Sequence, residues 1–140
     1  MNGEVRKRLS ANDVGDTGAH QAGILVPKEG KILSFFCRLD PREVNPRAAI
    51  VVRERGDSTR WEFNFIYYNN RFRGGTRNEY RLTCMTTYLR AVNARAGDEL
   101  AFTKDENGSI VLECVRAGSA SSDDDGDVLV LSGGWKIVEF

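Results

Sequence analysis

The stretch "RWEFNFIYY", Arg60–Tyr68, gives the clearest indication of how this chain folds. Aromatic residues occupy positions 61, 63, 65 and 67, where they alternate with Glu62, Asn64 and Ile66. Successive side chains of a β-strand point to opposite faces, so this alternation gathers the aromatic rings on one face. We therefore predict that Arg60–Tyr68 is a strand whose aromatic face is buried.

Shorter patterns on both sides of this strand predict a mainly β fold. Apolar runs and a hairpin signal at Asn107-Gly108 predict strands within residues 22–27, 48–55, 98–117 and 128–140. Helical spacing of apolar residues predicts a short helix in residues 28–40, whereas residues 81–94 fit either a strand or a short helix. Residues 1–21 show neither period and predict an extended arm or loop. About seven short strands with one or two small helices favour an antiparallel barrel or sandwich.

Composition limits the class of protein. The 140 residues fit one domain, and 20 basic residues balance 20 acidic ones. Three widely spaced cysteines and a single histidine match neither a disulfide framework nor a zinc site. No segment approaches the roughly 18 apolar residues that span a bilayer, so we expect no membrane partner. The expected location is the cytoplasm, in association with the bacterial nucleoid.

The segment after the aromatic strand is unusually cationic for a neutral chain. Residues 69–81 hold four arginines against the single carboxylate of Glu79, a local net charge of about +3. A guanidinium fork suits phosphates and guanine edges, an asparagine amide suits an adenine edge, and Glu79 suits a cytosine amino group. Gly74 and Gly75 allow a tight bend. The segment is either a DNA-reading loop or a hairpin tip with solvated arginines.

A second polar segment precedes the first predicted strand. Residues 10–21 offer hydrogen-bonding side chains, and Lys28 follows the strand closely. Two polar arms on one barrel would form a clamp. The alternatives are a disordered N-terminus and, for the lone histidine, an ordinary surface residue. The candidate DNA-binding residues of the two segments are Ser10, Asn12, Asp13, Thr17, His20, Gln21, Lys28, Asn69, Asn70, Arg71, Arg73, Thr76, Arg77, Asn78, Glu79, Tyr80 and Arg81.

Catalytic motifs are harder to find. No Asp followed by an Asp/Glu-x-Lys pattern is present, and the single histidine excludes mechanisms that need two. The acidic segment 118–127 carries Asp123, Asp124, Asp125 and Asp127, which could hold a hard cation but is typical of a flexible connection. We therefore expect no catalytic residues and no metal site. A small magnesium-dependent nuclease and a protein-interaction barrel remain as alternatives.

Two motifs resemble a known family. "TGAHQAGILVPKE" (residues 17–29) and "IYYNNRFRGGTRNEYRLT" (residues 66–83) are similar to the N-terminal effector domain of EcoRII-type restriction endonucleases, a B3-like DNA-binding domain. The resemblance extends over about residues 10–116, and "GDELAF" (residues 97–102) resembles a barrel strand of the wider B3 class. Two positions depart from the family pattern, because Tyr80 and Gly75 stand where basic residues are expected.

The resemblance implies a seven-stranded B3-like pseudobarrel, with residues 1–140 as a single DNA-binding domain. An N-arm (residues 10–21) and a C-arm (residues 69–81) would grip the major groove of double-stranded DNA. They would read a short GC-rich site, which is CC(A/T)GG for the EcoRII type. Such a domain does not cut DNA and needs no cofactor, since Mg²⁺ serves a separate nuclease domain of the same parent chain. A stand-alone B3-like regulator is the alternative.

Overall fold

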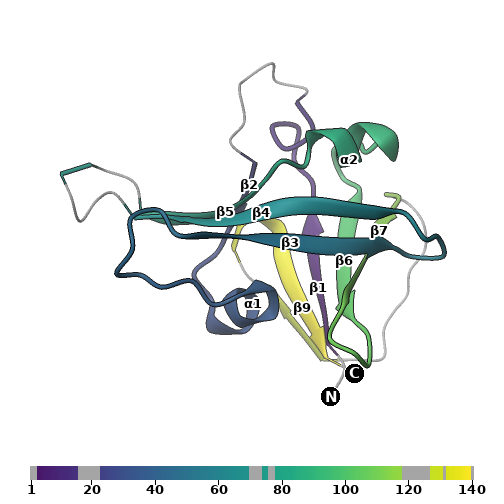
Figure 1. Ribbon diagram of the computed structural model, residues 1–140. Coiled ribbons are helices and arrows are strands. Elements are labelled where there is room, and N and C mark those ends of the chain that lie inside the picture. Colours follow the sequence, from purple (N-terminus) through teal and green to yellow (C-terminus); the bar gives the residue numbers. More distant parts are fainter. Residues whose placement is uncertain are drawn as a thin grey trace.

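The computed structural model describes residues 3–15, 23–69, 74–75, 78–117, 127–130 and 132–139. In these ranges the chain forms nine strands and two α-helices (Figure 1). The strands are β1 (Gly3–Arg8), β2 (Ile24–Val26), β3 (Arg47–Glu54), β4 (Arg60–Tyr68), β5 (Glu79–Thr83), β6 (Glu99–Lys104), β7 (Ile110–Val115), β8 (Asp127–Val130) and β9 (Trp135–Glu139). The helices are α1 (Gly30–Phe36) and α2 (Thr86–Ala91), and a 3₁₀ turn, Ser132–Gly134, precedes β9.

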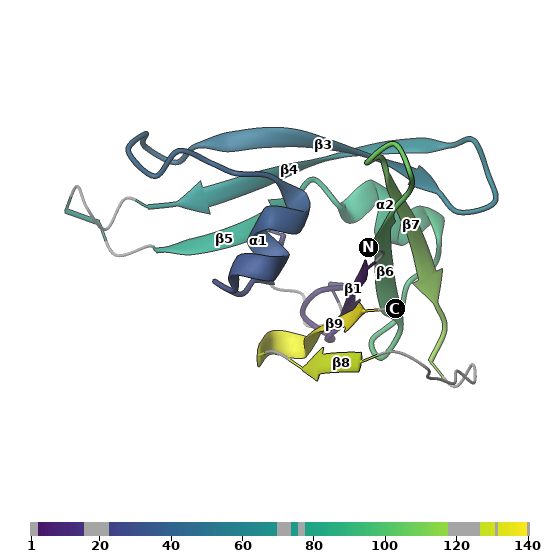
Figure 2. The same ribbon diagram turned by 90° about the horizontal axis from the view of Figure 1, so that it is seen from below.

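The strands form one sheet that curls almost into a closed barrel. Their order is β2-β5-β4-β3-β7-β6-β1-β9-β8, and only the β3–β7 pair is parallel. The curl brings β9 back to β2, where the indole Nε1 of Trp135 donates to the carbonyl of Leu25 at 2.8 Å. Seen from below, the strands surround the interior with α1 beside it (Figure 2). The predicted β pseudobarrel is therefore the observed architecture.

The burial pattern of strand β4 shows which face of the sheet is buried. Phe63, Phe65 and Tyr67 are buried on its inner face, whereas Glu62, directly before Phe63, is exposed. The strand pairs with β3 on one side and β5 on the other, so its aromatic row faces the middle of the barrel. The prediction made from "RWEFNFIYY" is confirmed in both its bounds and its buried face.

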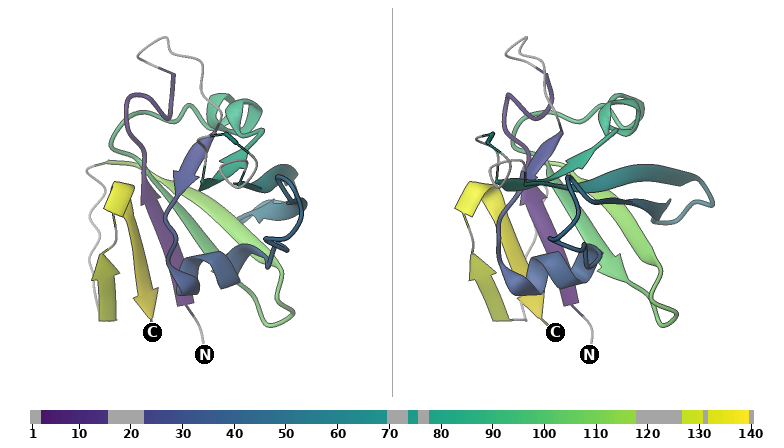
Figure 3. Two further views of the ribbon diagram at one scale, coloured as in Figure 1. Left: turned by 90° about the vertical axis from the view of Figure 1, so that its left-hand side faces the viewer. Right: turned by 60° about the vertical axis from the view of Figure 1, so that its left-hand side comes forward.

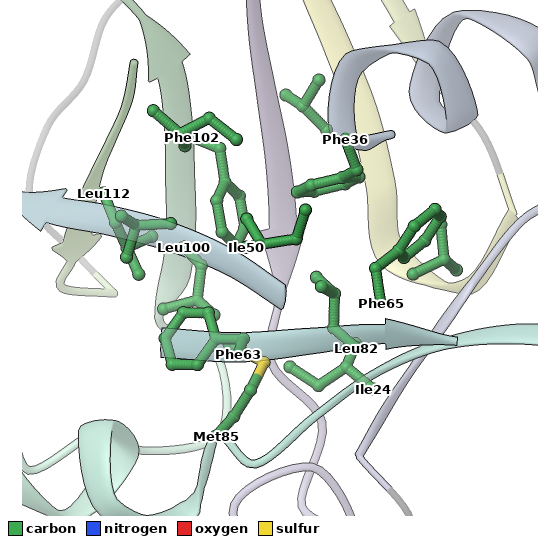
Figure 4. Close-up of a cluster of buried hydrophobic side chains, with 14 of the residues drawn as sticks. Ile24, Phe36, Ile50, Phe63, Phe65, Leu82, Met85, Leu100, Phe102 and Leu112 are labelled. Atoms are coloured by element: carbon green, nitrogen blue, oxygen red, sulfur yellow. The ribbon is translucent and has the colours of Figure 1, made fainter. Parts of the chain in front are cut away.

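The core combines aliphatic and aromatic side chains, and α1 contributes Phe36 to it (Figure 4). The ring of Phe36, at the end of α1, lies 5.5 Å from that of Phe65, 5.3 Å from that of Phe102 and 6.1 Å from that of Trp135. Burying one such side chain stabilises the fold by roughly 1.5–3 kcal/mol. Helix α1 thus closes one end of the barrel, and α2 lies at the opposite end (Figure 3).

Three expectations about the elements need correction. Residues 3–8 form strand β1 rather than part of an arm, and the described strands number nine rather than seven. Val5 and Lys7 of β1 are buried, as is Leu9 directly after it, so a charged residue breaks the apolar alternation that would have revealed the strand. Residues 81–94 contain both candidate elements, because β5 ends at Thr83 and α2 begins at Thr86.

The helices of the structure bear on the expectation about membrane-spanning segments. Within the described ranges, no helix is long and apolar enough to cross a membrane.

Candidate nucleic-acid interface

The structure divides the candidate residues into those it describes and those it does not. Lying outside the described residues are Thr17, His20, Gln21, Asn70, Arg71, Arg73, Thr76 and Arg77. Within the described residues are Ser10, Asn12, Asp13, Lys28, Asn69, Asn78, Glu79, Tyr80 and Arg81. This second group lies where the two arms leave the barrel. We call residues 9–15 together with Gly23, at the two ends of the N-arm, the N-arm root, and Asn69 together with residues 78–81 the C-arm root.

The N-arm root is a turn fastened to the barrel. Ser10 and Asp13 bond reciprocally, since the Asp13 carboxylate accepts from the Ser10 N–H at 2.9 Å and the Ser10 hydroxyl accepts from the Asp13 N–H at 3.1 Å. Asp13 also pairs with Lys7 of β1, at 3.1 Å from the ammonium Nζ. Lys7 is buried and donates as well to the carbonyl of Gly133. The Asp13 carboxylate is therefore occupied in holding the turn.

Asn69 directly follows β4 and is the part of the C-arm root from which the chain enters the C-arm. The residue is 3% exposed. Its N–H donates to Oδ1 of Asn45 at 3.1 Å, and its own Oδ1 accepts from the N–H of Asn45 at 2.8 Å. Its Nδ2 donates to the carbonyls of Pro41 at 3.2 Å and Glu43 at 2.7 Å. The side-chain amide is thus fully used inside the protein, so we assign Asn69 to positioning the arm rather than to touching a ligand.

Aromatic stacking holds the returning side of the C-arm root. Tyr67 and Tyr80 are opposite residues of β4 and β5, and their rings are nearly parallel with centroids 4.3 Å apart. The Tyr67 hydroxyl donates to Oδ1 of Asn78 at 2.7 Å. Burial, and then the neighbouring Tyr67, raises the pKa of Tyr80, so its phenol stays neutral at physiological pH. Tyr80 thereby stiffens the root at the position where the family pattern has a cation.

Arg81 connects the two roots. Its Nε donates to the Glu79 carboxylate at 2.6 Å, and its Nη1 donates to the carbonyl of Gly23 at 3.1 Å. Gly23 directly precedes β2, which continues from the N-arm. One guanidinium therefore links the end of the N-arm to the C-arm strand β5. It remains about a quarter exposed, which leaves part of its charge available to a partner.

The remaining described candidates are exposed. Lys28 lies on the surface between β2 and α1. Asn12 is exposed in the N-arm root, where its carbonyl accepts from the N–H of Gly15 at 3.2 Å. Gly74, in the C-arm, has a φ of 91°, which glycine adopts without strain.

The sequence did not reveal Lys7 and Asn45, which hold the two roots. Lys7 is a buried lysine in a charged run, and Asn45 follows a proline-containing loop far from the C-arm in sequence. Asn45 has a φ of 49°, a left-handed conformation that asparagine tolerates better than most residues. A lone Asn before a proline is a weak turn signal, and nothing in it points to a partner 24 residues away.

Metal and nucleophile chemistry find no support in the described part of the chain. No group of three or more histidine, cysteine or acidic side chains there could hold a metal ion. Asp123, Asp124 and Asp125 lie outside the described residues, and strand β8 begins at Asp127 rather than after it. Burial raises the pKa of the Cys114 thiol, the opposite of what a thiolate nucleophile requires.

Comparison of this chain with known proteins shows the family to which it belongs. A family model described as restriction endonuclease EcoRII, N-terminal, matches residues 4–131. The chain belongs to the EcoRII N-terminal family. The type II restriction enzyme EcoRII of Escherichia coli is 37% identical over 131 residues, a match that covers 88% of this chain and 31% of that enzyme. This member of the EcoRII N-terminal family thus spans about a third of the length of its curated relative.

Solved structures share the fold of this EcoRII N-terminal family member. The Arabidopsis FUS3–DNA complex has a TM-score of 0.62 at 18% identity, covering 81% of this chain and 96% of that one. The B3 domain of the UbaLAI restriction endonuclease, solved with cognate DNA, has a TM-score of 0.55 at 24% identity, covering 84% and 70%. The N-terminal domain of Helicobacter pylori LlaJI.R1 has a TM-score of 0.50 at 14% identity, covering 84% and 83%. The predicted B3-like fold is confirmed.

Proposed function

We propose that this chain binds double-stranded DNA sequence-specifically, as the recognition or effector domain of a restriction endonuclease. The observation that carries the proposal is the family match over residues 4–131. It is supported by two solved structures of similar fold that contain DNA, the FUS3 complex and the UbaLAI B3 domain.

The geometry of the roots suits such a role. Each arm leaves the barrel from a root fixed by several hydrogen bonds, and Arg81 links the two roots through Gly23. A binding element held in place before its partner arrives loses less conformational entropy on binding. We expect the arms to enter the major groove and read a short GC-rich site of the CC(A/T)GG kind. Arg71, Arg73 and Arg77 are the leading candidates for guanine edges and phosphates.

We also propose that the chain does not cut DNA by itself. It would act with a nuclease domain of a longer parent protein, inside the bacterial cell, and would bind DNA without a cofactor. Mg²⁺ would serve that separate nuclease domain. This proposal too is supported by the family match, whose description is of the N-terminal part of the endonuclease EcoRII.

A binding titration tests the function. Fluorescence anisotropy at low salt would compare duplexes containing CC(A/T)GG, related GC-rich sites and a shuffled sequence. We expect one site to bind at least about a thousandfold more tightly than the shuffled duplex. Arg77→Ala should weaken binding to that site by about 1–3 kcal/mol while changing shuffled-duplex binding less. Failure to bind any duplex would contradict the proposal, and magnesium-dependent cleavage of plasmid DNA, lost on Asp→Asn substitution in residues 123–127, would favour the nuclease alternative.

A further inference from the structure

The connection between α1 and β3, residues 37–46, is rigidly held although it has no regular secondary structure. Asn69 donates to two of its carbonyls and exchanges hydrogen bonds with Asn45, as described above. Buried Pro46 accepts a further bond at its carbonyl from the N–H of Tyr67, at 3.0 Å. Both Tyr67 and Asn69 lie where β4 leads into the C-arm. The connection is therefore fixed directly beside the C-arm root, at the same end of β4 (Figures 1 and 2).

This connection, together with the first residue of β3, presents exposed arginines. Arg38, Arg42 and Arg47 are all exposed, and the Arg42 side chain keeps 89% of its surface accessible. Two acidic residues of the same segment, Asp40 and Glu43, reduce its net charge to about +1. The segment is thus mildly cationic and held in a defined position, which is unusual for a loop with no other evident task.

Arg42 and Arg47 make only weak contacts within the described residues, so their guanidinium groups can leave these partners and bind a phosphate. Arg42 donates to both oxygens of Asp40, at 3.1 and 3.2 Å, and this side-chain hydrogen bonding lowers the pKa of Asp40. Ion pairs between solvent-exposed side chains are weak and are screened by salt. Among the described residues, the Arg47 side chain makes one long bond, of 3.4 Å from Nε to the carbonyl of Asn45. Neither guanidinium is committed to the fold as Arg81 is.

Strand register connects this segment to the candidate interface. Arg47 lies opposite Ile66 of β4, and Ile66 lies opposite Arg81 of β5. The three residues therefore form one row on the face of the sheet opposite the aromatic row of β4, and Ile66 in the middle of that row is buried. Arg47 stands at the far end of that row from β2, so a duplex engaged by the C-arm would have its sugar–phosphate backbone, rather than its base edges, closest to Arg47 and Arg42.

We propose that Arg42 and Arg47 form a third DNA contact, to the sugar–phosphate backbone beside the C-arm, and that Asn69 positions them. The inference rests on the proposed DNA-binding function and adds a surface outside both arms. A guanidinium donates two parallel hydrogen bonds to a phosphate and carries no sequence information in doing so. The contact therefore contributes affinity and register to binding at any sequence.

The test uses the double variant R42A/R47A on the duplex that binds best and on a shuffled duplex, over about 50–200 mM salt. We expect affinity to fall by a similar factor, about tenfold, on both duplexes. We also expect the slope of log affinity against log salt to decrease by about two, one for each phosphate contact. The charge-conserving double variant R42K/R47K should keep the parent slope. The matched control is Arg60→Ala, an exposed arginine at the opposite end of β4, which should leave both quantities unchanged.

Each other outcome counts against the proposal. A double variant that matches the parent and R60A in affinity and slope overturns it while leaving the DNA-binding function intact. A loss confined to the specific duplex assigns these arginines to base reading and overturns the backbone contact. A parent chain that binds neither duplex removes the function and this inference together. Thermal melting of the double variant should equal that of the parent, because both side chains are exposed.

Discussion

Three of the buried polar residues, Lys7, Asn69 and Asp98, fasten loops to the barrel. Each is less than 10% exposed. A buried polar group costs free energy unless its hydrogen bonds are made inside the protein, and all three have several partners. Asp98, directly before β6, accepts from the N–H groups of Arg95 and Ala117, both at 2.9 Å. It also accepts from Nη1 of Arg116 at 3.2 Å.

The contacts of Asp98 predict how the stability of the fold changes in acid. Burial acts to raise the pKa of its carboxyl, but the N–H groups of Ala117 and Arg95 and the guanidinium of Arg116 outweigh it, so the pKa is lowered. A folded-state pKa below the unfolded value gives stability that is present above about pH 4 and is lost as pH falls through the folded value. Asp98→Asn should therefore cost about 1–3 kcal/mol at neutral pH.

The measurement is urea unfolding of the parent chain and of Asp98→Asn from neutral pH to about pH 3. The difference in unfolding free energy between the two proteins should shrink below about pH 4, as the parent carboxylate gains its proton. A difference that stays constant over this range would show that the charge of Asp98 is not what stabilises the fold.

Single residues also show where the sequence stops being informative. The Arg, Asn and Asp content of residues 10–21 and 69–81 predicts two DNA-reading arms, and Arg71, Arg73 and Arg77 lie outside the described residues. The same residue types can hold a loop to the barrel or contact DNA, so composition could not show that Asn69 is buried. Its partner Asn45 is 24 positions away and is brought near only by the pairing of β3 with β4. Such a role is decided by tertiary contacts, which the local sequence pattern does not contain.

Among the elements, β2 is the shortest strand described and depends on the glycine before it. Gly23 has a φ of 91°, and a Cβ built there would lie 2.0 Å from the Leu82 carbonyl oxygen on β5. We expect Gly23→Ala to destabilise the fold by about 3 kcal/mol or more, because β2 must move away from β5 and the backbone is strained. It should also weaken the bond from Arg81 to the Gly23 carbonyl.

Gly56→Ala is the matched control in the turn between β3 and β4. Gly56 has a φ of 79°, but no heavy atom lies within 4 Å of a Cβ placed there. That variant should lose only about 1 kcal/mol, from the unfavourable φ alone. Equal losses of unfolding free energy in the two alanine variants would contradict the close approach of β2 to β5.

Elements with a regular pattern were predictable, and elements with buried charge were not. Strand β4 and the hairpin of β6 and β7 follow alternation and turn signals, and each has the expected buried residues. Strand β1 buries Glu4 and Lys7, so its sequence reads as a polar arm. Ion pairs make this burial tolerable: Arg6 pairs with Glu99, which is distant in sequence, and Lys7 pairs with Asp13, six positions along the chain.

For the whole molecule, Trp135 closes the barrel and keeps the N-arm side in place. It is 1% exposed, packs against Phe36 and Phe102, and donates from Nε1 to the Leu25 carbonyl on β2. In the part of the chain that the structure describes, sheet hydrogen bonds join β2 to β5 but not to β9, and the Trp135 donor bridges the opening of the barrel. A barrel that opened at this point would change the spacing of the two arm roots.

Trp135→Phe keeps an aromatic ring but removes the bridging N–H, so we expect a loss of about 1–3 kcal/mol in unfolding free energy. Local opening should be the distinctive effect, since amide hydrogen exchange reports the stability of individual elements. Protection of the β2 amides should fall more than that of β6 and β7. Trp61→Phe, which removes a bond to Glu54 at 3.1 Å, should leave β2 protection unchanged. If Trp135→Phe lowers protection equally in every strand, the indole stabilises the core as a whole, and the closure of the barrel does not depend on its hydrogen bond to Leu25.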